Sequence, residues 1–327
     1  MSEMPVTLCG FIIAALIGAT LPPWTAHADE ASTIPRIGVL NPAYTNTPAN
    51  EGLREGLHEL GYIEDKNVAI EWRFAGTREE LRSLAADLVR WKVDVIVVFS
   101  TQAARAATEA TTVPIVFLVG DPVSVGLAAS LARPGGNATG VSLVYTELTA
   151  KRLEILRLLA PEARRVGCLM NSSNPAGVLQ FEAAQSAART LDLQLVKMDA
   201  RNDAEVDAVV RTLPRSAIDA IFVTGDILLF ANRAKFASAI RKARLPAIFP
   251  AKEWHTTEVL ASYGPNIKEA GRKMAAYVDK ILKGAKPADL PIEQVSTYEF
   301  VIDLRAAREL KLNVPQDLLR RADEVIQ

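Results

Sequence analysis

Short polar segments follow the apolar, β-branched runs of this 327-residue sequence. In an open parallel sheet, ligands bind at the edge formed by the carboxyl ends of the strands. Hydroxyls and free amides at a helix start suit a carboxylate, an aspartate suits an amine, and an aromatic ring stacks on an apolar group. The predicted ligand-binding residues are Asn41, Tyr44, Ser100, Thr101, Gln102, Asp121, Asn171, Asn174, Thr224, Asp226, Trp254 and Tyr263. Their chemistry predicts binding of a small solute that carries a carboxylate, either an amino acid or an aromatic or aliphatic acid.

Each of these residues also has a purely structural interpretation. Ser100 and Thr101 precede a predicted helix and could simply cap it. Asp121 and the two asparagines could shape turns, and the aromatic side chains could pack at a hinge or lie on an exposed loop. Both interpretations stay open at the level of the sequence.

Motifs of metal, nucleotide or nucleophilic catalysis are missing from the sequence. H-E-x-x-H, C-x-x-C, G-x-x-x-x-G-K-[ST] and G-x-S-x-G do not occur. Beyond residue 28 the only histidines are His58 and His255, and Cys168 has the apolar neighbours typical of a buried strand. One histidine without a second ligand makes a poor metal site. We therefore expect no metal, no cofactor and no catalytic residue. The alternative is an enzyme on the same scaffold, with Asp121, Asp226 or His255 as acid or base.

The apolar runs occur twice in the same order, which indicates an internal duplication. The matching pairs are 36–41 with 165–171, 94–100 with 219–224, and 113–117 with 245–249. Each run is typical of a strand buried on both faces. Helical patterns lie between them at 51–60, 78–91, 103–110, 147–159, 178–191, 203–213 and 267–282. The alternation predicts an α/β fold with two doubly wound parallel-sheet lobes joined by a hinge.

A turn cluster at 133–137 precedes the expected change from one lobe to the other. The helix pattern at 267–282 and the apolar run at 298–303 follow the second lobe and are expected to cross back over the hinge. We expect lobe 1 to comprise residues 33–146 plus about 264–290. Lobe 2 is expected to comprise residues 147–263 plus about 291–327.

The first 28 residues have the pattern of a secretory signal peptide. Residues 8–21 are apolar apart from glycine and one threonine, they are too short to span a bilayer comfortably, and Ala26-His-Ala28 fits a cleavage site. Glu3 but no Lys or Arg precedes the apolar run, so an uncleaved anchor is the alternative. We expect cleavage after Ala28 and a mature chain without a membrane span in the periplasm. The formal charge of −1 predicts no nucleic-acid partner.

Collinear motifs cover nearly the whole mature chain. They include GDPV at 120–123 and RPGGNATG at 133–140, together with the segments 36–40, 55–62, 84–89, 114–117, 151–156, 300–304 and 322–326. With these motifs the sequence resembles the bacterial ABC-transporter substrate-binding proteins of the tryptophan/tyrosine-type family. The resemblance implies a periplasmic-binding-protein-like type I fold whose two lobes close on a solute. It also implies delivery of that solute to an ABC permease in the inner membrane.

The resemblance places the pocket at the same strand ends. It implies lining by 41–44, 100–102, 120–121, 171–174, 224–226 and the segment around Trp254. Some relatives bind aromatic amino acids, while the apolar segment 227–230 after Asp226 predicts a more apolar pocket in this chain. We expect a monomeric binding component of an importer. A solute sensor for a membrane kinase is a further alternative.

Overall fold

The structure is a computed structural model that describes residues 34–41, 47–75, 78–257 and 259–327. The predicted signal peptide (1–28) and Tyr44 lie outside the described residues, as does the side chain of His255. Within the described ranges, no helix has both the length and the apolar character needed to cross a membrane.

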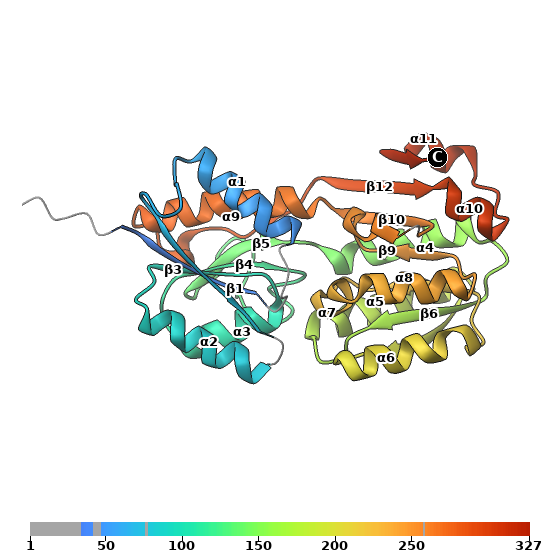
Figure 1. Cartoon of the computed structure of the whole chain (residues 1–327), viewed down its shortest axis with the longest axis horizontal. Coiled ribbons are helices and arrows are strands. Elements are labelled where there is room, and N and C mark those ends of the chain that lie inside the picture. The colour runs from blue at the N-terminus through green and yellow to red at the C-terminus, as the bar shows by residue number, and fades with distance from the viewer. Residues whose placement is uncertain (1–33, 42–46, 76–77, 258) are drawn as a thin grey trace, which may run out of the picture. The chain divides into compact units, whose positions relative to one another are not determined.

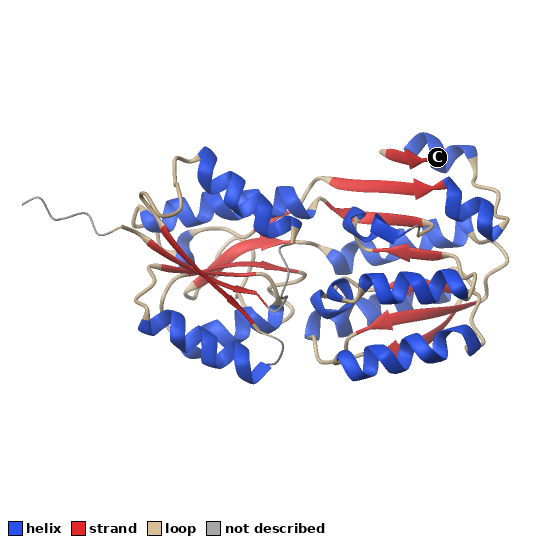
Figure 2. Cartoon of the chain, viewed as in Figure 1, coloured by secondary structure: helices blue, strands red, loops and turns tan. Residues whose placement is uncertain are grey.

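Within the described residues, the first sheet has six strands in the order β11-β5-β4-β3-β1-β2, all paired in parallel (Figures 1 and 2). These strands are β1 (Arg36–Asn41), β2 (Ala69–Phe74), β3 (Val95–Val98), β4 (Ile115–Val119), β5 (Ala138–Ser142) and β11 (Glu293–Gln294). Strands β3, β4 and β5 are buried along their whole length. Their apolar side chains meet helices on both faces, as in doubly wound proteins.

Helices α1 (Pro48–Glu59) and α9 (Ile267–Leu282) cover one face of the first sheet, and α2 (Arg78–Arg90) and α3 (Thr101–Ala110) cover the other (Figure 1). Helices α1 and α9 pack backbone to backbone. A Cβ at Gly52 would lie 1.9 Å from the carbonyl oxygen of Lys268, so this contact needs glycine. A helix from late in the chain therefore completes the core around the first sheet.

Within the described residues, the second sheet has seven strands in the order β13-β12-β10-β9-β8-β6-β7. They are β6 (Arg165–Met170), β7 (Gln194–Asp199), β8 (Ala220–Val223), β9 (Ala247–Phe249), β10 (Ala261–Pro265), β12 (Tyr298–Asp303) and β13 (Glu324–Ile326). The pair β10–β12 is antiparallel, and the other pairs are parallel. The order β9-β8-β6-β7 repeats β4-β3-β1-β2, as the duplicated apolar runs predict.

Helices cover both faces of the second sheet as well. One face carries α4 (Tyr145–Leu159), α5 (Pro175–Thr190), α10 (Leu304–Leu310) and α11 (Gln316–Arg321). The other carries α6 (Asp203–Thr212), α7 (Ile227–Ala231) and α8 (Arg233–Lys242). The short 3-10 helices are η1 (Leu213–Arg215), η2 (Lys252–Thr257) and η3 (Pro287–Asp289).

The chain passes between the sheets at three places in the described ranges: between β5 and α4, between β10 and α9, and between β11 and β12. Val144, in the first passage, has a φ of +48°, which a β-branched residue adopts only under strain. The second and third passages are hydrogen-bonded to each other, because the Asn266 amide donates to the Thr297 carbonyl at 3.2 Å. Strand β11 keeps residues 293–294 on the first sheet, whereas the boundary was expected near 290.

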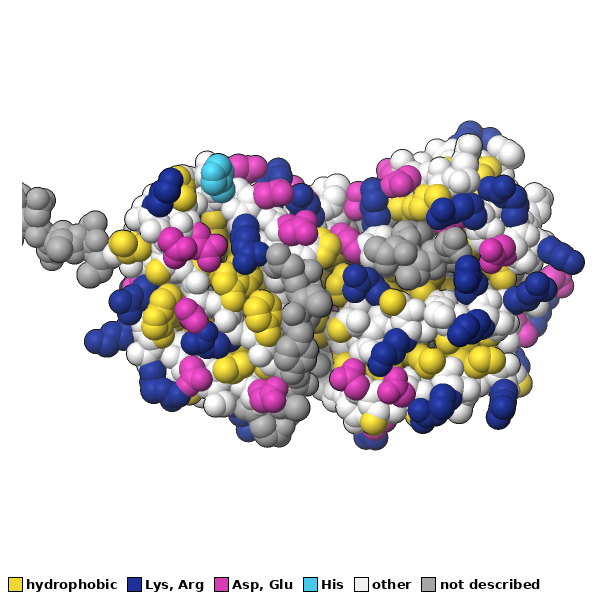
Figure 3. Space-filling model, viewed as in Figure 1, with side chains coloured by type: hydrophobic (Ala, Val, Ile, Leu, Met, Phe, Trp, Pro, Cys, Tyr) yellow, Lys and Arg dark blue, Asp and Glu magenta, His cyan; other side chains and the backbone are white. Residues whose placement is uncertain are grey.

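Basic and acidic side chains are interspersed on the face of the molecule shown in Figure 3. Over the helices of the second sheet, basic side chains are more frequent than acidic ones in this view, as the sequence of α8 also indicates.

Candidate functional site

A pocket lies at the carboxyl ends of strands from both sheets. Its space outside protein atoms, counted together with the solvent open to it, is about 750 Å³. Its lining is mostly apolar, with a few polar groups. The lining residues are Thr47, Pro48, Ala49, Phe99, Ser100, Thr101, Leu118, Val119, Gly120, Leu143, Tyr145, Asn174, Ala176, Gly225, Asp226, Ile227, Phe230, Pro250, Ala251, Trp254 and Ile267.

The polar lining comes largely from helix N-caps. Four capping side chains line the pocket: Thr47 caps α1, Ser100 caps α3, Asn174 caps α5 and Asp226 caps α7. The first turn of a helix has amide groups without intrahelical partners, and its dipole favours negative charge. The Ser100 hydroxyl accepts a 3.1 Å hydrogen bond from the Ala103 amide and so marks the start of α3. The converging helix starts suit the carboxylate of a ligand.

Asp226 places a buried carboxylate in this wall, with 7% of the residue exposed. Its carboxylate accepts hydrogen bonds from the amides of Leu228 and Leu229 at 2.9 and 3.2 Å. The Nδ2 atoms of Asn174 and Asn171 donate at 2.8 and 3.3 Å. Burial raises the pKa of Asp226, and these hydrogen bonds oppose the rise. No described Lys, Arg or His forms an ion pair with it, so an ammonium group would find an unneutralised partner.

Aromatic side chains form another part of the pocket lining. Trp254 is 2% exposed and packs edge-on against Phe230, with ring centroids 5.7 Å apart, and tilted against Phe249 at 5.1 Å. Tyr145, the first residue of α4, places its ring against Gly225. Burial raises the pKa of the Tyr145 hydroxyl, which bonds to no described residue. Such a wall fits an apolar or aromatic ligand side chain.

Of the predicted site residues, the structure brings Ser100, Thr101, Asn174, Asp226 and Trp254 together in the pocket lining. Their contact with a ligand stays a prediction. The structural roles considered for Ser100 and Asn174 are also present, because both cap helices.

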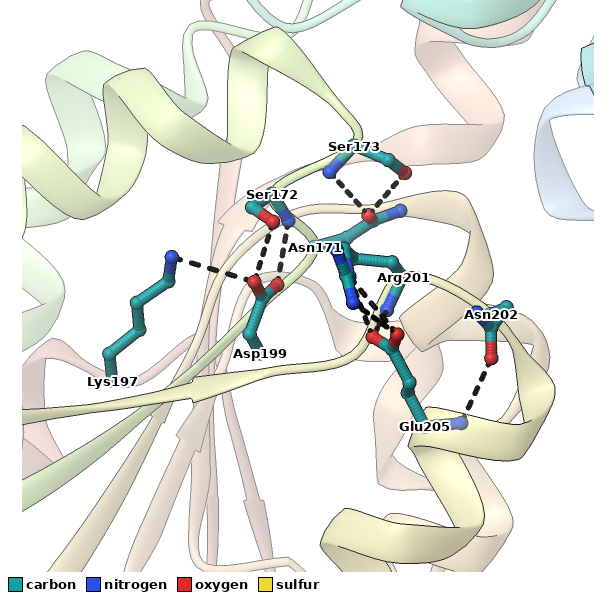
Figure 4. A network of polar contacts seen from close by, with 8 residues as sticks. All are labelled: Asn171, Ser172, Ser173, Lys197, Asp199, Arg201, Asn202 and Glu205. Atoms are coloured by element: carbon teal, nitrogen blue, oxygen red, sulfur yellow. Dashed lines mark hydrogen bonds and ion pairs between the residues drawn. The ribbon is translucent and has the colours of Figure 1, made fainter.

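Asn171 lies directly behind the lining. Its Nδ2 supports Asp226, and its Oδ1 accepts from the amide and hydroxyl of Ser173 at 3.0 and 2.6 Å (Figure 4). The neighbouring Ser172 donates from its amide and hydroxyl to Asp199 at 2.8 and 2.5 Å. Burial alone would raise the pKa of Asp199, but these bonds and the Lys197 charge bring it below its ordinary value. This network holds the turn between β6 and α5.

The remaining predicted residues within the described ranges do not line the pocket. Asn41 donates a 3.1 Å hydrogen bond to the Asn50 side chain and is fully buried. Thr224 is also fully buried and donates to the Leu169 carbonyl at 3.2 Å. Gln102, on the first turn of α3, is half-buried outside the lining. Asn41 and Thr224 support the adjacent turns, and their contact with a ligand stays a prediction.

Asp121 and Tyr263 also differ from their expected place. Asp121 accepts a 3.2 Å hydrogen bond from the Ser124 amide, so it shapes the turn after β4. Tyr263 packs against Tyr298 and Phe300, with ring centroids 6.2 and 6.0 Å away. It thereby joins the core around the second sheet, not the pocket.

Sequence reasoning missed several lining residues, above all Thr47 and Tyr145. A signal existed for Thr47, because threonine followed by proline is a common helix start. Tyr145 directly follows the passage from β5 to α4, and no sequence pattern connects it to Gly225. Phe230 belongs to the apolar segment 227–230 that predicts a more apolar pocket, whereas Phe99 lies in an apolar run typical of a buried strand.

The described residues contain no group of three or more His, Cys, Asp or Glu side chains placed to hold a metal ion. Cys168 is buried, as predicted, and burial raises the pKa of its thiol to about 12. Such a thiol is a poor nucleophile.

Comparison with known proteins gives a consistent result. A family model described as ABC transporter substrate binding protein matches residues 41–326. A tyrosine-binding protein from Clostridioides difficile (strain R20291) is 27% identical over 282 residues, which span 84% of this chain and 81% of that protein. The structure of an ABC domain in complex with L-Trp from Streptococcus pneumoniae is 27% identical, with a TM-score of 0.83, over 90% of this chain and 100% of that one.

A more distant structure shows the fold alone. The periplasmic binding ribose operon repressor protein from Lactobacillus acidophilus is 14% identical, with a TM-score of 0.55, over 80% of this chain and 94% of that one. The predicted α/β fold, with two parallel-sheet lobes of the periplasmic-binding-protein type I kind, is confirmed by these likenesses.

Proposed function

Because the chain belongs to the family of ABC transporter substrate-binding proteins, we propose that it captures an amino acid with a large apolar or aromatic side chain for an ABC importer. Members of this family are substrate-binding proteins and not enzymes. We further propose that it works as a monomer in the periplasm, after removal of residues 1–28, and that its partner is an inner-membrane permease.

One observation carries this proposal: the pocket combines a buried carboxylate, converging helix starts and an aromatic wall. Asp226 offers a negative charge to an ammonium group. The starts of α3 and α1, with Ser100 and Thr47, offer amides and hydroxyls to a carboxylate. Trp254 and Tyr145 offer apolar surface to a side chain. An α-amino acid presents these three groups from a single carbon atom.

The relatives support the class of ligand. One is named a tyrosine-binding protein, and another was solved with L-Trp. Both ligands are amino acids with a large aromatic side chain, which matches the chemistry of the pocket.

We propose that capture involves closure of two lobes. The lobes are residues 33–146 plus about 264–290, and residues 147–263 plus about 291–327, with the second boundary nearer 295 if β11 is counted with β5. The three passages between the sheets would serve as the hinge. Closure would remove water from around Asp226 and strengthen its interaction with an ammonium group.

Thermal unfolding of residues 29–327 with L-tryptophan, L-tyrosine, L-phenylalanine and L-leucine tests the proposal. Tryptamine, which lacks the carboxylate, and indole-3-propionate, which lacks the amine, serve as matched probes. We expect at least one amino acid to raise the melting temperature, since a ligand stabilises the folded state it binds. The two probes should raise it much less. If no amino acid stabilises the protein, or if a bound compound is chemically converted, the proposal is wrong.

Substitution of the carboxylate sharpens this test. Asp226→Asn should weaken amino-acid binding by roughly 10- to 150-fold, because a hydrogen bond to a charged group contributes about 1.5–3 kcal/mol. Asp207→Asn, on the exposed side of α6, is the control and should bind like the wild type.

A further inference from the structure

Arg152 is a buried cation on α4. The residue is 0% exposed, and its Cζ lies 4.6 Å from the centroid of the Phe222 ring. Its Nε makes no hydrogen bond although it is buried. Among the described residues, no carboxylate lies within ion-pair distance of the guanidinium. Burial lowers the pKa of Arg152 to about 10, so the group remains charged at neutral pH.

A charge in this position is costly to bury, and packing alone would be better served by an apolar side chain. The guanidinium of Arg152 makes two hydrogen bonds. Its Nη1 donates a 2.8 Å hydrogen bond to the carbonyl of Val223, the last residue of β8. Its Nη2 lies 3.4 Å from the Oε1 of Gln180 on α5. Arg152 therefore bridges α4, α5 and the point where the chain leaves the second sheet toward the pocket.

Gln180 extends this connection to the pocket lining. Its Oε1 accepts a 2.7 Å hydrogen bond from the Gly225 amide, and its Nε2 donates to the Gly225 carbonyl at 3.1 Å. The Nε2 also donates to the Ala176 carbonyl at 3.2 Å. Both backbone groups of Gly225 are thus held by one fully buried side chain.

Gly225 in turn determines where two pocket groups lie. It directly precedes Asp226 in the chain. Its backbone also lies against the Tyr145 ring so closely that a Cβ at 225 would be 2.5 Å from two ring atoms. A shift of the Gly225 peptide would therefore move the carboxylate, the ring or both.

We propose that Arg152 and Gln180 are positioning residues that fix the Gly225 peptide and thereby hold Asp226 where the ammonium group of the ligand meets it. The inference rests on the proposed function, since it concerns how the amino group of the ligand is recognised. Neither side chain lines the pocket, so the effect of each is transmitted through Gly225.

The test compares an amino acid with its analogue that lacks the amine. The probes are L-tryptophan with indole-3-propionate, and L-leucine with 4-methylpentanoate. The dissociation constant of the analogue divided by that of the amino acid measures how well the site recognises the amine. This ratio does not depend on the overall stability of the protein. We expect Gln180→Met and Arg152→Met to lower this ratio by about tenfold, since a charge-assisted hydrogen bond depends strongly on geometry.

A core variant on the same helix is the matched control. Ile155 is 1% exposed on α4 and lies outside the pocket lining. Ile155→Ala should lower the melting temperature and leave the ratio as in the wild type. Arg152→Lys keeps the positive charge on a shorter side chain. Its ratio should lie between those of Arg152→Met and the wild type. It also keeps the test usable if Arg152→Met does not fold.

The outcomes separate the two proposals. If the wild type prefers the amino acid and the Gln180 and Arg152 variants keep that preference, the positioning role is wrong and the proposed function stands. If the wild type binds neither of these amino acids nor L-tyrosine or L-phenylalanine, the proposed function fails and this inference falls with it.

Discussion

The Nδ2 of Asn174 lies 2.8 Å from the Oδ2 of Asp226, and this bond joins the first turn of α5 to the first turn of α7. Each of the two side chains also caps its own helix. The Asp226 carboxylate therefore caps α7, accepts from the cap residue of α5 and lines the pocket. Burial raises the pKa of Asp226, and the Asn174 amide donor opposes that rise.

The first prediction concerns this pair. Asn174→Ser retains a capping hydroxyl but loses the Nδ2 donor, so the pKa of Asp226 should rise further. An ammonium ligand needs the ionised carboxylate, so its affinity is full above the pKa of Asp226 and is lost as the pH falls through it. The loss should therefore begin at a higher pH in the variant, with affinity at mildly acidic pH about tenfold weaker. Calorimetric titrations across a pH series would measure it.

The control for this pair is Asn202→Ser, which changes the cap of α6 away from the pocket. It should leave the pH profile of binding unchanged. A profile for Asn174→Ser that overlays the wild type would contradict the assigned role of the amide.

Strands buried on both faces could be predicted from the sequence, and edge strands could not. β1, β3, β6 and β8 are continuous apolar runs, because each lies between two layers of helices. β2 and β7 lie at the edges of their sheets and are only partly buried, with charged residues such as Glu71 and Lys197 inside them. α7 was missed because its apolar run has no helical period over five residues.

The rule that ligands bind at strand ends predicted where the pocket lies but not which side chains reach it. Thr224 and Asp226 are two residues apart, yet one donates to the Leu169 carbonyl inside the fold and the other lines the pocket. Local hydrogen-bond partners decide such orientations, and these partners are distant in sequence. The contact between Tyr145 and Gly225 likewise depends on the packing of α4 against the second sheet, which no local pattern encodes.

Gly225→Ala is predicted to damage both stability and binding. The new Cβ would lie 2.5 Å from Cδ2 and Cε2 of Tyr145, so the ring or the Gly225 peptide must move. Overpacking of this kind costs about 1–3 kcal/mol. Gly136→Ala is the matched control, since no atom lies within 4 Å of its added Cβ. Chemical denaturation and ligand titration would compare the two.

Addition of Tyr145→Ala to Gly225→Ala should restore stability without restoring affinity, because the clash and the ring disappear together. Such non-additivity is expected of residues in contact. Additive losses of stability in the double variant would show that the ring is not what the new methyl group meets.

Glu253 is predicted to make stability depend on pH. Burial raises its pKa from 4.5 to about 7, and its Oε2 has no hydrogen-bond partner among the described residues. A folded-state pKa above the unfolded value means that the folded protein binds more protons between these values. Through this group, the free energy of unfolding should fall as the pH rises from about 4.5 to 7 and stay reduced above that.

Glu253→Gln removes that penalty. The variant should be more stable than the wild type at pH near 8, by on the order of 1–3 kcal/mol, and nearly equal to it near pH 4. Glu309→Gln, on the exposed surface, should change stability little at either pH. Urea denaturation at both pH values would measure the differences. A glutamine variant less stable than the wild type at the higher pH would show that the ionised carboxylate stabilises the fold.

Trp254 is predicted to report ligand binding. It lines the pocket, whereas Trp72 stacks on Arg54 and Trp91 on Arg36, outside the lining. L-Phenylalanine has no indole, so a change of protein tryptophan emission on its binding should arise at Trp254. Trp254→Phe should abolish the change, and it keeps most of the aromatic contact with Phe230. Trp91→Phe is the control and should retain the change. If the Trp254 variant responds as the wild type does, the ligand lies elsewhere than against this ring.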